Sequence, residues 1–369
     1  MKKKVRHLLG ISGGKDSAAL AIYMRNNYPD LDIEYYTSDT GKELDETYRL
    51  IEDLEIYLGK KIIRLSAASN SHETPFDHFL KMYGGFLPSS QARWCTNKLK
   101  LEPFERFVGD DLVISYVGIR GDENREGYIS KKSNIQSIFP FRRNIWSEDV
   151  TMKAFGNQNI SLLEEIFMSL NLENIEEQLI EIVRKPVSPR YTLDTKVSQL
   201  LESSIKGTNE LIYGYLKTTD YPLAGDTSFP LLNNEDNLDR ENIFQILEDS
   251  GIGIPKYYKE LEFNTATKNG KYARSRSGCF FCFYQQKIEW VWLLEQHPEL
   301  YGQAMQYEKD GYTWMQDESL EQLREPERVE KIKQDYLKKL ERSREKTGSS
   351  LLVDILAESE GEGCASCFI

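Results

Sequence analysis

Apolar and polar positions follow two alternating spacings along the first 145 residues. The segment KVRHLLGI (4–11) predicts a short buried strand, and DSAALAIYMRNNY (16–28) carries its apolar residues at helical spacing. The pattern repeats with a strand at DIEYYTSDT, an amphipathic helix at KELDETYRLIEDLEIYLGK and a third strand at KIIRLSA. A helical segment, TNKLKLEPFERFV, then precedes a fourth strand at DLVISYVGI. This alternation predicts a doubly wound α/β domain with a parallel sheet over residues 1–145.

The strand pattern stops after residue 145. Residues 146–237 contain leucine-rich stretches such as SLLEEIFMSLNLENIEEQLIEIV and predict a mostly helical insertion. Residues 238–346 predict a helical C-terminal region that includes RSRSGCFFCF, and residues 347–369 predict a flexible tail.

The net charge of −12 argues against broad contact with a phosphate backbone, but the cations are unevenly distributed. Residues 91–143 hold ten Lys and Arg against seven Asp and Glu, and residues 268–287 hold five Lys and Arg and no acid. An anionic substrate is therefore compatible with the chain. No apolar run reaches the ~18 residues of a membrane span, and the first residues lack the pattern of a signal peptide. We expect a cytoplasmic protein without a membrane partner; its oligomeric state is not indicated.

The stretch SGGKDS lies between the first strand and the first helix. Its glycines would expose backbone N–H groups and the positive end of the helix dipole to an anion in the turn. It is neither a Walker A loop nor a G-x-G-x-x-G fingerprint. Taken alone, it is compatible with a phosphate-binding loop or with a tight turn in which Asp16 caps the helix.

SGGKDS resembles the PP-loop of the adenine nucleotide α-hydrolase-like superfamily, whose ATP pyrophosphatases carry SGGxDS and cleave ATP between the α and β phosphates to adenylate a substrate. Three later segments resemble the phosphoadenosine phosphosulfate (PAPS) reductase-like branch: SDTGKE (38–43), RWCTNKLKLEPF (93–104) and GIRGDENREGY (118–128). These segments follow or flank strands, so they should converge at the carboxyl edge of the sheet.

The resemblance implies roles for individual residues. The loop would hold the pyrophosphate of ATP together with Mg²⁺, and this set is Ser12, Gly13, Gly14, Lys15, Asp16 and Ser17. The nucleotide would be bordered by Asp39, Thr40, Gly41, Glu43 and Gly118. The cations expected to face phosphates are Arg93, Lys98, Arg120 and Arg125. Catalysis would rest on Lys15, Asp16, Arg120 and Arg125.

Two features favour a pyrophosphatase over a reductase. Reductases of this family usually depart from SGGxDS, whereas this loop is complete, and assimilatory reductases commonly end in a segment containing ECGLH, which is absent here. A PAPS or APS reductase-like oxidoreductase remains an alternative, as do a tRNA thiolation enzyme and a noncatalytic nucleotide-sensing module.

The five cysteines include two C-x-x-C pairs, which point to metal or redox chemistry. The spacing of Cys279 and Cys282 fits zinc or an iron–sulfur cluster. Family members with a 4Fe-4S cluster also use a cysteine pair in the RWCTNK segment, where this chain has Trp94 and Cys95. Three ligands, Cys95, Cys279 and Cys282, would leave one iron open. Alternatively, Cys364 or Cys367 closes the cluster or carries a persulfide, and Cys95 is only a small buried hydrophobic residue.

The combination of a complete loop and a cluster resembles the DNA phosphorothioation component of the Dnd and Ssp systems. There, a backbone phosphate oxygen is activated and exchanged for sulfur from a cysteine desulfurase. The resemblance therefore implies ATP, Mg²⁺ and a 4Fe-4S cluster as cofactors. It implies a cysteine desulfurase and DNA, or a DNA-binding complex, as partners.

Overall fold

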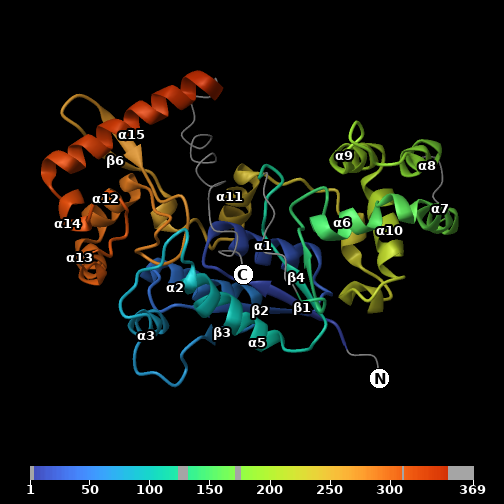
Figure 1. The fold of residues 1–369 in the computed structure, drawn as a ribbon, viewed down its shortest axis with the longest axis horizontal. Helices are drawn as coiled ribbons and strands as arrows, with labels where there is room; N and C mark the ends of the chain where they lie inside the picture. The colour runs from blue at the N-terminus through green and yellow to red at the C-terminus, as the bar shows by residue number, and fades with distance from the viewer. Residues whose placement is uncertain (1–3, 124–131, 171–175, 310, 348–369) are drawn as a thin grey trace.

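A five-stranded parallel sheet forms the centre of the molecule (Figure 1). The computed structural model describes residues 4–123, 132–170, 176–309 and 311–347. The strands are β1 (Arg6–Gly10), β2 (Ile33–Asp39), β3 (Ile62–Ser66), β4 (Val113–Tyr116) and β5 (Ile135–Ile138). They lie in the order β3-β2-β1-β4-β5, so β2 and β3 lie on one side of β1 and β4 and β5 lie on the other. The gap beyond the carboxyl end of β1 is thus a topological switch point, where open α/β sheets bind ligands.

Neighbouring residues of the inner strands face opposite sides of the sheet. In β1, Leu9 joins the core beneath α1 (Lys15–Asn27) and α2 (Asp45–Leu58), whereas Leu8 joins a smaller core beneath α5 (Glu102–Val108). Tyr35 and Tyr36 of β2 divide in the same way. This two-residue alternation places helices on both faces, which confirms the predicted doubly wound α/β fold.

The fifth strand was not predicted from the sequence. Two of its four residues, Gln136 and Ser137, are polar, yet both are buried. Gln136 accepts a hydrogen bond from Leu223 N, which belongs to a 3-10 turn, η3 (Pro222–Gly225). Burial of these polar residues depends on that distant segment, so the local pattern did not indicate a strand.

The predicted helix over TNKLKLEPFERFV is irregular. A short helix, α4 (Trp94–Thr96), leads into a π-helical turn, η1 (Asn97–Leu101), and then into α5. A π turn adds a residue to the helical repeat and therefore rotates the side chains that precede it relative to those that follow.

Helices and 3-10 turns are the regular elements of the described chain between residue 146 and residue 237. They are α6 (Glu148–Ala154), η2 (Asn157–Asn159), α7 (Ile160–Ser169), α8 (Glu176–Arg184), α9 (Leu193–Ser203), α10 (Ile205–Leu216), η3 and η4 (Pro230–Asn233). Leu163, Leu200 and Leu211 belong to the same core as the residues beneath α1. One core therefore continues from the sheet domain into the helical insertion. The domain boundaries predicted at residues 145 and 237 stay a prediction.

The C-terminal region begins with α11 (Arg240–Asp249) and η5 (Lys256–Tyr258). It continues through a hairpin, β6 (Leu261–Asn264) and β7 (Asn269–Tyr272), and through α12 (Lys287–Gln296), α13 (Pro298–Tyr307), α14 (Leu320–Leu323) and α15 (Pro326–Thr347). Trp290 and Phe281 share a second core with Phe76 of α3 (Pro75–Met82) and with Trp94. The C-terminal region therefore packs on the segment between β3 and β4.

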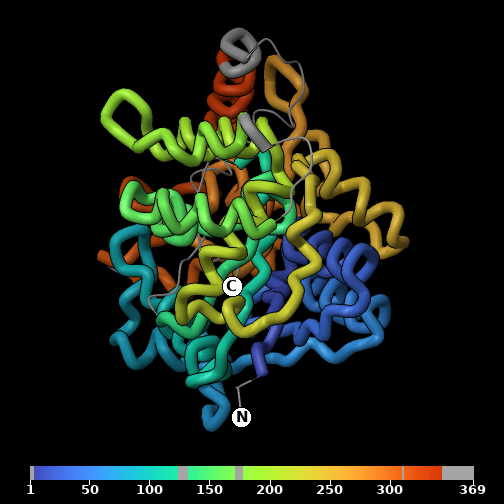
Figure 2. Tube along the Cα trace, turned by 90° about the vertical axis from the view of Figure 1, so that its right-hand side faces the viewer, coloured from blue at the N-terminus to red at the C-terminus, as the bar shows by residue number. Residues whose placement is uncertain are grey.

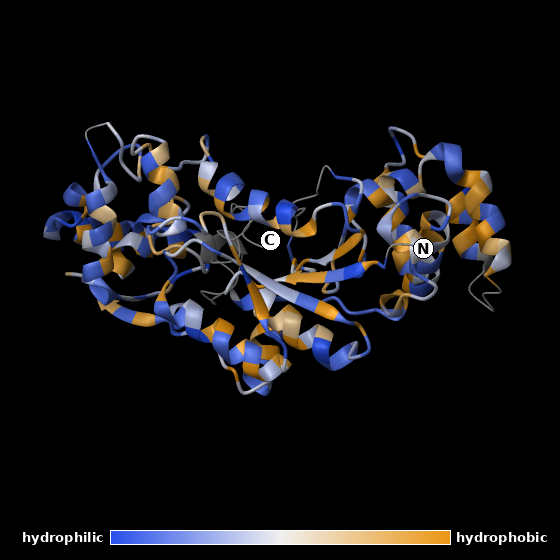
Figure 3. Ribbon diagram, turned by 90° about the horizontal axis from the view of Figure 1, so that it is seen from below, coloured by the Kyte–Doolittle hydropathy of each residue, from blue (hydrophilic) through white to orange (hydrophobic). Residues whose placement is uncertain are grey.

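The helical insertion and the C-terminal region lie at opposite ends of the sheet (Figures 1 and 3). Figure 2 views the molecule from the side of the insertion, and the green helices of the insertion lie in front of the orange and red C-terminal region. Among the residues that the structure describes, no helix is both long enough and apolar enough to span a membrane. The predicted tail, residues 347–369, falls outside the described chain except for its first residue.

Candidate functional site

The loop SGGKDS occupies the switch point between β1 and α1. Gly13 has φ +73°, and a Cβ atom there would lie 2.2 Å from Thr47 Cγ2. At Gly14 a Cβ atom would lie 2.7 Å from Ser277 Oγ. Gly13 therefore requires glycine for its backbone conformation, whereas a Cβ atom at Gly14 would have to displace the Ser277 hydroxyl.

Asp16 does not cap the first helix. The N-cap of α1 is Gly14, which has no side-chain cap, and Asp16 lies inside the first turn. The hydroxyl groups instead brace the loop: Ser17 Oγ accepts from Ser12 N (3.1 Å) and donates to Gly14 O (3.1 Å). Gly14 N in turn donates to Ser12 Oγ (3.3 Å). The helix-cap interpretation of Asp16 is therefore wrong.

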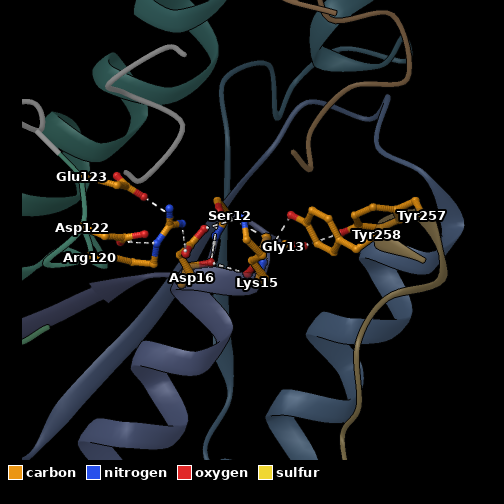
Figure 4. Close-up of polar contacts among 11 residues, drawn as sticks. Ser12, Gly13, Lys15, Asp16, Arg120, Asp122, Glu123, Tyr257 and Tyr258 are labelled. Atoms are coloured by element: carbon orange, nitrogen blue, oxygen red, sulfur yellow. Dashed lines mark hydrogen bonds and ion pairs between the residues drawn. The ribbon is translucent and has the colours of Figure 1, made fainter. Parts of the chain in front are cut away.

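A buried charge network surrounds Asp16 (Figure 4). Its carboxylate lies 3.2 Å from Lys15 Nζ and 2.9 Å from Arg120 Nη1. Arg120, at 1% exposure, also pairs with Asp122 (2.8 Å) and Glu123 (2.8 Å). Burial alone would raise the pKa of Asp16, but the charges of Lys15 and Arg120 outweigh it and hold that pKa below its ordinary value.

The network ties the end of β4 to the loop. A Cβ atom at Gly118 would lie 3.0 Å from Asp16 O, which is tighter than an ordinary contact, so glycine favours this approach of the two backbones. Arg120 contacts three carboxylates here. The sequence also predicts that it contacts phosphates, and that stays a prediction. Arg125, predicted for the same role, lies outside the described residues.

A small pocket, which we call the loop pocket, opens beside the SGGKDS loop. It is lined by Ser12, Thr37, Ser38, Asp39, Glu43, Thr47, Tyr48, Ile51, Arg64, Lys100 and Gly278. Ser38 Oγ is buried and has no hydrogen-bond partner among the described residues. Buried hydroxyl groups are normally paired, so this hydroxyl points to a ligand or water in the pocket.

Carboxylates border the loop pocket at the end of β2. Asp39 Oδ1 accepts from Gly41 N (2.8 Å) and from the hydroxyl of Tyr48 (3.1 Å). Glu43 accepts from Thr40 Oγ1 (2.6 Å) and from Tyr48 (3.0 Å). Burial, together with the nearby charge of Asp39, raises the pKa of Glu43 above its ordinary value.

The three predicted cysteine ligands lie around a second pocket, which we call the thiol pocket. Its lining is Thr40, Phe76, Pro88, Cys95, Thr96, Leu99, Lys100, Ser277, Gly278, Cys279, Phe281, Cys282, Phe283, Tyr284 and Trp314. Burial raises the pKa of the Cys279 and Cys282 thiols. Cys279 Sγ lies 3.2 Å from Thr40 Oγ1, and a β-bridge joins Cys279 to Glu43.

The loop pocket and the thiol pocket adjoin, because Lys100 and Gly278 line both. Lys100 was not among the predicted site residues, whereas Lys98 was. Lys98 pairs with Glu102 (2.5 Å), and Arg93 is exposed with its guanidinium 5.4 Å from the centre of the Tyr284 ring. The π turn at 97–101 includes both lysines, and this irregularity could not be recognised in the sequence pattern.

Two further residues at the loop, Tyr257 and Tyr258, were missed. They come from η5, more than 240 residues later in the chain, and contact Gly13 and Lys15. No motif in their surroundings indicated such a contact.

Within the described part of the chain, no group of three or more His, Cys, Asp or Glu side chains is arranged to hold a metal ion. The predicted Mg²⁺ and 4Fe-4S cofactors therefore remain proposals.

Comparisons with known proteins agree with the fold. Residues 6–143 match the family model of the phosphoadenosine phosphosulfate reductase domain. The uncharacterized protein MJ0066 of Methanocaldococcus jannaschii is 36% identical over 153 residues, which cover 38% of this chain and 29% of that protein. The tRNA-specific 2-thiouridylase MnmA of Actinobacillus succinogenes is 24% identical over 171 residues, 37% of this chain and 42% of the enzyme. MnmA of Mannheimia succiniciproducens is 25% identical over 138 residues, 34% and 33% of the two chains.

The chain thus spans less than half the length of these curated relatives. No solved structure matches it. The SGGKDS loop at the switch point of a parallel sheet agrees with these matches, and residues 6–143 are similar to the PP-loop, adenine nucleotide α-hydrolase-like superfamily.

Proposed function

We propose that this protein is an ATP pyrophosphatase that adenylates a substrate oxygen so that sulfur can replace it. The observation that carries the proposal is the junction of the two pockets: the loop pocket and the thiol pocket share Lys100 and Gly278. Members of the PP-loop superfamily bind ATP, typically with Mg²⁺. A nucleotide in the loop pocket would therefore lie beside three thiols.

The loop supplies binding and charge neutralisation. Backbone N–H groups at the start of α1 and the ammonium group of Lys15 suit the β and γ phosphates, and the unpaired hydroxyl of Ser38 suits a polar ligand. Lys100, at the junction, is suited to stabilise charge that develops near the α-phosphate. Such positioning and electrostatic stabilisation account for most of the rate in phosphoryl and nucleotidyl transfer.

The proposed reaction has two displacements. An oxygen of the acceptor attacks the α-phosphorus of ATP, the bond between the α-phosphorus and the bridging oxygen breaks, and pyrophosphate leaves. A thiol reductant, such as excess cysteine, supplies two electrons that release the persulfide sulfur of the donor as sulfide, and the reductant becomes a disulfide. The sulfide then attacks the adenylated centre, and AMP leaves with the acceptor oxygen. The products are AMP, pyrophosphate and a thiolated acceptor.

The thiol pocket suits an iron–sulfur cluster by its donor chemistry, because Cys95, Cys279 and Cys282 line one pocket among aromatic side chains. The positive charges of Lys100, Arg274 and Arg276 act on the Cys282 thiol and would offset the negative charge of a thiolate-bound cluster. A 4Fe-4S cluster with three cysteine ligands would supply an iron atom with an open position for a sulfur ligand.

We further propose that the acceptor is the DNA backbone and that a cysteine desulfurase donates the sulfur. The exposed Arg93 beside the thiol pocket favours a nucleic acid. Residues 78–101 hold three further Lys and no acid, but Lys81 and Lys98 pair with Glu73 and Glu102. Tyr83 and Phe86 are 40% and 39% exposed on the same segment, and exposed rings of this kind stack with bases. Similarity to tRNA-specific 2-thiouridylases makes tRNA thiolation the second candidate.

The test uses the full chain with Mg²⁺, ATP labelled in the α-phosphate, cysteine and a cysteine desulfurase. Either DNA or tRNA is added, and nucleosides are analysed by mass spectrometry. AMP, pyrophosphate and phosphorothioate-linked DNA are expected, and thiolated tRNA alone would select the second candidate. Release of ADP and phosphate would contradict the pyrophosphatase proposal. Sulfite formed from phosphoadenosine phosphosulfate would favour a reductase, and ATP binding without turnover would favour a sensing module.

The cluster has its own test, anaerobic purification followed by iron and sulfide quantitation. Iron and sulfide should fall together in Cys279→Ser and Cys282→Ser. Cys364→Ser serves as the matched control and should keep its iron and sulfide. Loss of both in this variant would show that the tail supplies a fourth ligand to the cluster. One zinc per chain and no iron in any preparation would contradict the cluster proposal.

A further inference from the structure

Two adjacent tyrosines from the C-terminal region contact the SGGKDS loop. Tyr257 and Tyr258 are both buried, and their ring centres lie 4.6 Å apart. The hydroxyl of Tyr257 donates to Gly13 O (2.8 Å), while the hydroxyl of Tyr258 accepts from Lys15 N (3.4 Å). Figure 4 shows both rings on the side of the loop opposite Arg120. The two hydroxyls therefore act on different groups of the loop, one as donor and one as acceptor.

Tyr257 fixes the orientation of a peptide group. Gly13 O and Gly14 N belong to the same trans peptide and point in opposite directions. With the carbonyl bonded to Tyr257, the N–H faces Ser12, which lines the loop pocket. Glycines on both sides make rotation of this peptide easy, so the Tyr257 hydrogen bond selects one orientation.

Tyr258 contacts the two groups of Lys15 that suit a phosphate. Its oxygen accepts the N–H at the first residue of α1, a group that has no partner within the helix. The ammonium group of Lys15 lies 5.1 Å from the centre of the Tyr258 ring. A phosphate oxygen carries negative charge and forms a stronger hydrogen bond than a neutral phenol at 3.4 Å, so an anion in the loop would displace the hydroxyl.

We propose that the two tyrosines affect nucleotide binding with opposite sign. Tyr257 is a positioning residue that holds the loop in the form that binds the pyrophosphate group. Tyr258 occupies the Lys15 N–H until a phosphate takes it, and so weakens binding. This inference rests on the proposed function, because it assigns the pyrophosphate group of ATP to the loop.

The test measures dissociation constants of Mg²⁺–pyrophosphate and of Mg²⁺ with a nonhydrolysable ATP analogue by calorimetry on the full chain. Tyr257→Phe should weaken both about two- to ten-fold, because the freed peptide populates orientations that do not bind. Tyr258→Phe should tighten both about two- to five-fold, because the Tyr258 oxygen then no longer competes with a phosphate for the Lys15 N–H. Thermal melting identifies variants that fail to fold.

Tyr301→Phe is the matched control. Tyr301 is also buried in the C-terminal region and donates to a backbone oxygen, that of Leu320 (2.7 Å), but it lies outside the loop. It should lower the melting temperature and leave both constants unchanged. Equal shifts of the same sign in the dissociation constants of the two loop variants would overturn the inference. Lower melting temperatures with unchanged dissociation constants would overturn it too. Both results would leave the proposed function intact. A wild-type chain that binds neither ligand would refute both.

Discussion

Gly13→Ala tests the geometry of the loop most directly. The substitution places a Cβ atom 2.2 Å from Thr47 Cγ2 and forces an alanine to adopt φ +73°. The left-handed backbone costs about 1–2 kcal/mol for a residue with a Cβ. Overpacking against a buried methyl adds about 1–3 kcal/mol. We therefore expect the free energy of unfolding to fall by about 2–5 kcal/mol.

A second substitution separates the two contributions. Thr47→Ser removes Cγ2, and the next atoms near the new Cβ are Thr47 Cβ at 3.5 Å and Ile51 Cδ1 at 3.9 Å, which are ordinary contacts. In the double variant the overpacking disappears and only the backbone cost remains. The coupling energy between the two sites should therefore be about 1–3 kcal/mol in the favourable direction.

Urea denaturation of the wild type, both single variants and the double variant measures this cycle. Thr47→Ser alone should cost about 1 kcal/mol, because it deletes one buried methyl group. If the two substitutions are additive within error, Thr47 does not limit the space at Gly13. The packing described for the loop would then be incorrect.

Two further predictions concern charges at the site. Because the folded-state pKa of Asp16 is lowered, its ionised carboxylate should stabilise the protein above about pH 4 and lose this effect as the pH falls further. Asp16→Asn should thus be less stable than the wild type at neutral pH, with a difference in melting temperature that shrinks in acid; a constant difference would contradict the lowered pKa. Lys100→Ala should lower kcat/KM for AMP formation at least about ten-fold, because Lys100 lines both pockets. The control Lys98→Ala should change it less than about two-fold, since Lys98 pairs with Glu102 on the helix surface, and equal losses would show that the pocket junction is not the reacting centre.

Most of the sheet could be predicted from the sequence. The strands that became β1 to β4 have local patterns of apolar and β-branched or aromatic residues, and the helices between them have helical spacing. The edge strand β5 could not be predicted, because its buried Gln136 depends on a contact with Leu223. The π turn that contains Lys98 and Lys100 likewise depends on packing rather than on local preference.

The candidate site divides in the same way. The SGGKDS loop was recognisable because its residues are adjacent in sequence and match a known motif. The contacts that restrict its glycines, with Thr47 and Ser277, showed only in the structure. The pairing of Asp16 with Arg120, 104 residues away, showed only in the structure. A sequence resemblance grouped the three cysteines, and the structure brings Cys95, Cys279 and Cys282 to one pocket.

By itself, the sequence determined the alternation of β1 to β4 with helices along the chain and the place of the glycine-rich turn, because both follow from the spacing of neighbouring residues. Only the tertiary structure decided which lysine lines the pockets and that Tyr257 and Tyr258 contact the loop. These contacts join segments more than 240 residues apart, or depend on the phase of an irregular helix. They form when the C-terminal region packs its core against α3 and Trp94, and no local pattern specifies that packing.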